Sequence, residues 1–452
     1  MSSLQSQAPP PGLLRPYEMP MPRRRRLANG LTVVSAEHAI TPVVAIHVMI
    51  DAGTVRESAA QAGLASLVAN SLDAGAAGRS GETLAWEFER LGVEIHTEAT
   101  TEAAWISATV PVERLRPTLA LLADIVRRPD FPAADVDRVR DEQLAEILQR
   151  RDEPRALAND LILHFLYGDD DAYGRPAVGL ADRVRSLTRD DAMCFHQAGI
   201  SPERTTVVLA GAIDAGEALA AVEAQFGDWR HETAGPDRPD AGLSPLPAAV
   251  HVVDRAGSVQ SEIRVAHIGV QRTHPDYFAL RVMNTIFGGA FTSRLNLSLR
   301  ERYGFTYGVR SGFAFRRNPG PFTIQTAVAT EVTHRAVEEI VRELVLMHDS
   351  GAADEEVANA RDYLAGVVPL ESQTADQLAS RFAELVLFDL PDDYYRGYRA
   401  AIQAVTADDV ARVAREHLRP DDLTVCVVGD AAAIREPLEG VVGNISVHPV
   451  PQ

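Results

Sequence analysis

Residues 293–311 of the chain read SRLNLSLRERYGFTYGVRS, and the pattern of this stretch changes once, in the middle. Up to Gly304 the pattern is helical, because Phe291, Leu295 and Leu299 recur at four-residue spacing, and β-favouring residues follow from there. Glycine readily adopts the left-handed conformation that ends many helices. The stretch therefore predicts a helix, a sharp reversal at Gly304 and a strand.

Two polar side chains flank this reversal. Arg300 lies about 6 Å before it in the helix and Tyr307 about 10 Å after it in the strand, so both can reach one ligand. Arginine offers a planar fork of N–H donors and tyrosine a neutral O–H donor, which together can hold a peptide carbonyl and its developing oxyanion. The alternative is ordinary: an arginine beside Glu301 on an exposed helix and a tyrosine in a half-buried strand.

The composition sets the class of protein. A chain of 452 residues is too long for one core and predicts at least two domains. With 46% hydrophobic and 24% charged residues it is typical of a soluble globular protein, and its net charge of −19 argues against nucleic-acid binding. Two cysteines, Cys194 and Cys426, exclude a disulfide framework, and no apolar run is long enough for a membrane span. These features predict a cytoplasmic location.

The order of segments predicts two halves. Residues 1–22 are rich in proline and predict a flexible N-terminal arm, and the basic run Arg23–Arg26 predicts a solvated flank before the first strand. Proline, glycine and aspartate gather in residues 231–248, which predict a linker. The expected domains are therefore residues 23–230 and 249–452.

The second half repeats the first. The strand FTIQTAVATE, 322–331, corresponds to WISATVPVE, 105–113, at an offset of about 218 residues, and each runs into a helix. The helical segment 401–417 corresponds in the same way to 186–196. Because strands come in adjacent pairs and are followed by runs of helices, the fold class is α+β: two homologous domains, each a mixed, mostly antiparallel sheet covered by helices.

An ordered set of short pieces now identifies a family resemblance. In sequence order they are NGLTVV, GLASLVANSLDAG, PDF, YGRPAVG, SRLNLSLRERYGFTYGVRS and AVTADDVARVAREHLRPDDLTVCVVGD. The chain resembles the pitrilysin/insulinase family of zinc metallopeptidases from about residue 26 to residue 433. It is most similar to short bacterial members that resemble mitochondrial processing peptidase subunits. The resemblance implies two domains that fold like halves of a clam, and pairing of two such chains around a closed chamber.

The chain departs from the family at the zinc motif. Active members carry H-x-x-E-H on a helix, where two histidines bind zinc and the glutamate is the general base. The aligned positions here read Ser66, Leu67, Val68, Ala69 and Asn70. Neither histidine nor base is present, and hydroxyl and amide groups are poor zinc ligands. Glu146 falls near the position of the family's distal carboxylate ligand, but one carboxylate cannot hold the metal, and no other pair of histidines has helical metal spacing. We expect no metal in this chain.

The second-half motif is retained. The resemblance assigns an arginine and a tyrosine seven residues later to binding the substrate backbone beside the scissile bond, and Arg300 and Tyr307 match that spacing. Gly288 and Gly289 precede the helix and predict a place where backbone approaches a peptide, or a simple turn.

These observations predict the non-zinc subunit of a heterodimeric metallopeptidase, inactive alone. Its partner would be a homologous chain that holds the zinc, the water and the glutamate base, and its substrate an extended peptide. Alternatives are a catalytically inert structural homologue, a peptide-binding module for another enzyme, and hydrolysis at a nonstandard site, for which the local motifs supply no nucleophile and base.

Overall fold

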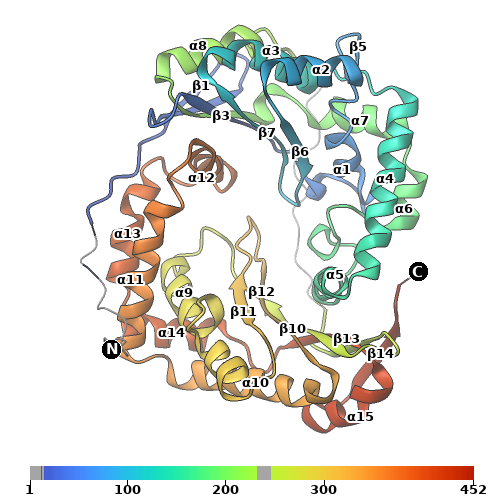
Figure 1. Cartoon of the computed structure of the whole chain (residues 1–452), viewed down its shortest axis with the longest axis vertical. Helices are drawn as coiled ribbons and strands as arrows, with labels where there is room; N and C mark the ends of the chain where they lie inside the picture. The colour runs from blue at the N-terminus through green and yellow to red at the C-terminus, as the bar shows by residue number, and fades with distance from the viewer. Residues whose placement is uncertain (1–11, 13–14, 232–245, 452) are drawn as a thin grey trace, which may run out of the picture.

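The computed structural model describes residues 12, 15–231 and 246–451, and it contains two six-stranded sheets, one from each half of the chain. The two sheets lie at opposite sides of the molecule, with helices around them (Figure 1). Within these described ranges, no helix is long and apolar enough to cross a membrane.

The sheet of the N-terminal half has the order β1-β2-β8-β3-β7-β6. Every neighbouring pair in it is antiparallel except β2 and β8, which are parallel. The bounds of its strands are β1 Arg23–Arg26, β2 Thr32–Glu37, β3 Val43–Ile50, β6 Ile95–Ala99, β7 Ala104–Pro111 and β8 Thr205–Gly211. A separate small ribbon joins β4 (Gly75–Ala76) and β5 (Arg79–Ser80).

The sheet of the C-terminal half has the order β11-β12-β10-β13-β9-β14. Read from its β14 end, this order repeats that of the first sheet, but β14 runs parallel to β9 whereas β1 runs antiparallel to β2. The bounds of its strands are β9 Val250–Asp254, β10 Gln260–Ile268, β11 Val309–Phe313, β12 Pro321–Ala329, β13 Thr424–Gly429 and β14 Ile445–Pro449. The predicted fold class, mixed and mostly antiparallel sheets covered by helices, is confirmed.

The helices repeat as the strands do. Those of the N-terminal half are α1 Leu64–Ala69, α2 Gly81–Leu91, α3 Leu115–Arg127, α4 Ala133–Asp152, α5 Pro154–Tyr167, α6 Ala181–Ser186, α7 Arg189–Gly199 and α8 Ala215–Phe226. Those of the C-terminal half are α9 Tyr277–Asn284, α10 Thr333–Ser350, α11 Asp354–Leu370, α12 Ala375–Leu387, α13 Tyr394–Ala404, α14 Ala407–His417 and α15 Ala431–Val442. Two wide π-helical turns, η6 (Thr285–Gly289) and η7 (Asn296–Arg302), follow α9.

The same capping box begins α7 and α14. The Thr188 hydroxyl accepts a hydrogen bond from the Asp191 amide, while the Asp191 carboxylate accepts one from the Thr188 amide, and Thr406 and Asp409 repeat this arrangement in the second half. The single helical segment expected over residues 401–417 is instead two helices, because the box starts α14 anew at Thr406.

One helix of each half packs on the sheet of the other half. Helix α5 of the N-terminal half packs on β10 and β13, and helix α12 of the C-terminal half packs on β3 and β8 (Figure 1). In α5, Ala158 and Ile162 are buried against Val253, Ala266 and Val428 of the second sheet. We call this arrangement the helix exchange, and it joins the two halves through their cores.

The N-terminal segment differs from its expectation over the part that the structure describes. Residues 15–22 lie against the C-terminal half, with Met19 only 4% exposed and the Arg15 carbonyl accepting a hydrogen bond from Arg399. The basic run Arg23–Arg26 is not a flank but the edge strand β1, and Arg24 forms an ion pair with Asp392. An edge strand needs only backbone hydrogen bonds, so its side chains can all be charged. Most of the predicted linker lies outside the described residues.

Candidate functional site

Helix α1 carries the positions of the degenerate motif, and a buried glutamate caps its start. The Glu57 carboxylate accepts hydrogen bonds from the amides of Gly63 (3.0 Å) and Ala65 (2.9 Å). Burial raises the pKa of Glu57 to about 7, although these two hydrogen bonds act in the opposite direction. Gly63 has a φ of 104°, a conformation that suits glycine. Sequence reasoning missed Glu57, because a carboxylate in a loop ahead of the helix has no periodic signal.

The three motif side chains do not form a zinc site. The Ser66 hydroxyl donates a hydrogen bond to the Ala177 carbonyl (2.6 Å), and the Asn70 side-chain oxygen accepts one from the Thr97 hydroxyl (3.4 Å). Ala69 is buried and carries no donor atom. The Ser66 hydroxyl is already bonded to a carbonyl, Asn70 offers only an amide and Ala69 only a methyl group. None of the three supplies the imidazole or carboxylate ligands that zinc prefers. The residues present therefore do not fit a zinc ion.

Helix α4 meets α1 through a glutamine. Gln143 is buried and its amide nitrogen donates to the carbonyls of Gly63 (2.9 Å) and Val178 (2.7 Å). Glu146, the residue near the family's distal ligand, is exposed on the same helix, where its charge contributes to raising the pKa of Arg150. The contact between the two helices is thus made by a neutral side chain.

The second-half motif has the predicted reversal. Gly304 has a φ of 65°, its amide donates to the Arg300 carbonyl (3.1 Å), and the Phe305 amide donates to the Leu299 carbonyl (2.8 Å), which closes the end of η7. Leu295 and Leu299 are fully buried, as their spacing predicts. The prediction for Phe291 was wrong, because this residue precedes the helix and is 69% exposed.

Arg300 and Tyr307 lie on either side of this reversal in different surroundings. The Arg300 guanidinium lies 4.3 Å from the centre of the Phe291 ring, and its Nε lies 3.4 Å from a Glu301 carboxylate oxygen. Tyr307 is 96% exposed and lies in the loop before β11, not in the strand itself as predicted, because the strand begins only at Val309. The contacts of Arg300 are to these neighbours rather than to the Tyr307 ring, so joint binding of one ligand stays a prediction.

An asparagine that sequence reasoning missed fixes the strand after Tyr307. The Asn296 amide nitrogen donates to the Val309 carbonyl (2.9 Å), and the Asn296 side-chain oxygen accepts from the Val309 amide (3.1 Å). Asn296 thereby bonds to β11 as a neighbouring strand would. The Thr326 hydroxyl also lies 3.0 Å from the Gly308 carbonyl oxygen. Tyr307 is therefore an exposed ring on a loop that is held from two sides.

Of the two glycines before the motif, Gly288 lies against β11 and Gly289 lies against Asn284 at the end of α9. A Cβ added at Gly288 would come within 2.3 Å of the Ser311 hydroxyl, and one added at Gly289 within 2.9 Å of the Asn284 side-chain nitrogen. The lack of a side chain at Gly288 thus serves the close approach of η6 to β11 within the chain. Approach of a peptide to the same glycines stays a prediction.

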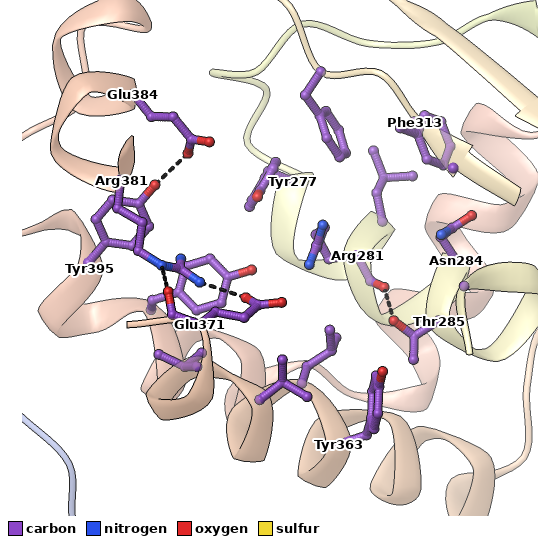
Figure 2. A pocket seen from close by; sticks show the side chains of 18 of the residues that line it. Tyr277, Arg281, Asn284, Thr285, Phe313, Tyr363, Glu371, Arg381, Glu384 and Tyr395 are labelled. Atoms are coloured by element: carbon purple, nitrogen blue, oxygen red, sulfur yellow. Dashed lines mark hydrogen bonds and ion pairs between the residues drawn. The ribbon is translucent and has the colours of Figure 1, made fainter. Parts of the chain in front are cut away.

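Both glycines line a cavity of about 670 Å³ between α9, β11, α11, α12 and α13 (Figure 2). Its walls carry hydroxyl and charged groups. Arg381 forms an ion pair with Glu371 (2.6 Å), and the Tyr395 hydroxyl donates to Glu384 (2.6 Å). Burial, with a smaller contribution from Glu384, raises the pKa of Tyr395 well above its ordinary value, so the phenol stays a donor. The lining therefore combines charged, hydroxyl, aliphatic and aromatic side chains.

The fold brings together two histidines that are far apart in sequence. His274, Asp276 and His417 place one potential ligand atom each within 4.8 Å of one another. Asp276, however, receives two hydrogen bonds from Arg412 (2.6 and 3.0 Å), which, with His417, lower its pKa to about 2. Because the guanidinium already occupies this carboxylate, the cluster is an ion-pair network that links α14 to the start of α9.

Comparisons with known proteins agree with this architecture. Residues 32–175 match the family model Insulinase (Peptidase family M16), and residues 186–364 match the model Peptidase M16 inactive domain. An uncharacterized zinc protease of Streptomyces coelicolor is 28% identical over 423 residues, which covers 91% of each chain. A probable mitochondrial-processing peptidase subunit beta of Schizosaccharomyces pombe is 25% identical over 435 residues, which covers 91% of this chain and 92% of that protein.

Solved structures share the fold. The crystal structure of a peptidase M16 inactive domain from Pseudomonas fluorescens superposes with a TM-score of 0.84 at 25% identity, covering 90% of this chain and 98% of that one. A protease from Helicobacter pylori has the same TM-score at 17% identity and covers 91% of this chain. The two family models match residues of both halves of the chain. The chain belongs to the M16 family of peptidases, the insulinase/pitrilysin family, with an N-terminal and a C-terminal family domain.

Proposed function

We propose that this chain is the non-zinc subunit of a heterodimeric M16 metallopeptidase. In this proposal a homologous partner with an intact H-x-x-E-H motif holds the zinc, the water and the general base. Arg300 and Tyr307 of this chain bind the peptide backbone and the oxyanion at that site, and the complex is cytoplasmic. Family membership and the likeness to an inactive M16 domain fit a non-catalytic subunit.

One observation carries the proposal: the chain has lost the zinc motif but presents Tyr307 on a fixed loop. Ser66, Ala69 and Asn70 cannot bind the metal, whereas Tyr307 is 96% exposed while Asn296 and Thr326 hold the backbone after it. An exposed aromatic ring on a well-bonded loop is available to a ligand from outside the chain. The edge strand β11, directly after Tyr307, offers backbone groups to an extended peptide.

A second candidate is a catalytically inert structural or peptide-binding homologue. The packing of Arg300 favours it, because the guanidinium already contacts the Phe291 ring and Glu301. In an active complex this arginine would have to turn from those contacts to the substrate. In the inert homologue it would stay where it is.

The test is cleavage of a quenched fluorescent peptide by this chain, by a zinc-motif homologue and by their mixture. Activity in the mixture alone, reduced at least about tenfold by Arg300→Ala or Tyr307→Phe, is the expected result. Arg302→Ala and Tyr303→Phe, close to the motif residues in sequence, are the matched controls and should leave the activity unchanged. Size-exclusion chromatography must show that each variant still forms the complex. A mixture no more active than the homologue alone would favour the inert role.

A further inference from the structure

A second cavity, of about 370 Å³, lies beside Tyr307 on the face of the C-terminal sheet that α5 partly covers. Its walls carry three arginines and one carboxylate, from Arg155, Arg264, Arg310 and Glu262. The whole chain has a net charge of −19, so this is a locally cationic site on an acidic protein. The cavity is separate from the larger one in Figure 2, although Arg310 lines both.

The strand register explains why two of these arginines converge. Gln325 of β12 lies opposite Arg264 of β10 on one side and opposite Arg310 of β11 on the other. Residues directly opposite one another in a sheet point to the same face, and neighbouring strands lie about 4.8 Å apart. Arg264 and Arg310 therefore stand about 10 Å apart in one row, within reach of a shared ligand.

The arginines differ in how many hydrogen bonds they already make within the chain. Arg264 is 1% exposed and donates to Asn159 (2.7 Å), to Glu262 (2.9 Å) and to the Arg155 carbonyl (3.2 Å). It forms the fixed back wall, and Glu262 balances its charge. The side chains of Arg155 and Arg310 are exposed at the mouth of the cavity. Arg155 lies in the first turn of α5, where the helix dipole opposes a cation and favours an anion.

We propose that this cavity binds the carboxylate of an aspartate or glutamate side chain of the extended peptide whose backbone Tyr307 contacts. The inference rests on the proposed function and adds to it a preference for acidic peptides. The guanidinium groups of Arg155 and Arg310 would donate charge-assisted hydrogen bonds to the carboxylate, whose planar fork matches theirs. A lysine at the same position of the peptide would meet two cations and be rejected.

The test measures peptide binding to this chain alone by fluorescence anisotropy. The probes are short C-terminally amidated peptides with a rhodamine label, identical except for Glu, Gln or Lys at one position that is moved along the peptide. Amidation removes the C-terminal carboxylate, so the peptides differ only in the side chain at the varied position. At one position the Glu peptide should bind about tenfold more tightly than the Gln peptide in low salt, and this advantage should shrink as salt is added.

Variants connect the preference to the cavity. The double variant Arg155→Gln and Arg310→Gln should bind the Glu and Gln peptides equally, whereas Arg302→Gln, an exposed arginine outside the cavity, should keep the preference. Tyr307→Phe should weaken the binding of the Glu and Gln peptides by the same factor. The inference is overturned if no peptide binds, if none shows a Glu preference, or if the preference survives in the double variant. Because no zinc partner is present, this result is independent of whether the mixture cleaves peptides.

Discussion

Nε2 of His47 lies 2.8 Å from Oδ1 of Asp376 and thereby bonds the first sheet to a helix that comes from the other half of the chain. His47 is on β3 and only 7% exposed, whereas Asp376 is in the first turn of α12. His47 alternates along β3 with Ile46 and Val48, so it lies on the face of the strand opposite these hydrophobic residues. That face is covered by the helix exchange, so the histidine is buried and has a partner.

Removing this carboxylate should loosen α12. We expect Asp376→Asn to lower the free energy of unfolding by about 1 kcal/mol at neutral pH, because His47 loses a charged partner. The hydrogen bond to His47 lowers the pKa of Asp376. The stabilisation of the fold by this carboxylate is therefore present above the ordinary aspartate pKa and is lost as the pH falls through the lowered value. Urea titrations at several pH values check this, with the exposed Asp421→Asn as control. A stability loss that does not shrink in acid would contradict the assignment.

The helix exchange should couple the unfolding of the two halves. Ile162 of α5 is 2% exposed among residues of the second sheet, so Ile162→Ala should destabilise the protein by about 2–5 kcal/mol. Calorimetry should still show one transition, moved to lower temperature. Leu148→Ala, on the exposed side of α4, should change stability by less than about 0.5 kcal/mol. Two separated transitions in the Ile162 variant would show that the halves unfold independently.

Glu57 should make the protein less stable as the medium becomes more alkaline. Burial raises its folded-state pKa from 4.5 to about 7, so the folded state holds the proton more tightly than the unfolded chain does. The contribution of Glu57 to the free energy of unfolding is therefore fully present below its pKa in the unfolded chain and is lost as the pH rises through about 7. Glu57→Gln, which cannot ionise, should flatten this part of the stability profile, whereas the exposed Glu113→Gln should not. Equal slopes in wild type and Glu57→Gln would contradict the assignment.

Asn296 should control the order of the Tyr307 loop. Asn296→Ala leaves the buried amide and carbonyl of Val309 without their side-chain partners, which costs about 1–3 kcal/mol. We expect faster amide hydrogen exchange over residues 305–313 and unchanged exchange in β10. Leu297→Ala, a half-exposed neighbour on the same helical turn, is the control. If exchange in the loop stays slow, other contacts hold Tyr307.

The parts of the fold that follow from local pattern could be predicted. The reversal at Gly304 depends on neighbouring residues, the repeat at about 218 residues shows in a comparison of the two halves of the sequence, and the structure has both. The strand β1 was not predicted, because four consecutive arginines show no alternation of apolar and polar residues. Only their backbone groups pair with β2.

The remaining features depend on how the chain folds back on itself. The row that contains Arg264 and Arg310 arises only when three strands pair. The pairing of Asn296 with Val309 and the cap that Glu57 gives to α1 each depend on the path of the intervening loop. A side chain that satisfies a distant backbone group leaves no periodic signal in its own neighbourhood. The exposed position of Phe291 was missed for another reason, because four-residue spacing does not say where a helix begins.

The helix exchange also bears on how such a chain could arise. A polypeptide with one copy of the repeated unit would have a sheet whose covering helix must come from elsewhere, since α5 and α12 each pack on the other unit's sheet. In a pair of identical copies, the helix of each copy could pack on the sheet of the other, as in a domain-swapped dimer. The present chain has the organisation of such a dimer joined into one polypeptide, with the same strand order in both sheets and a difference in the direction of one edge strand.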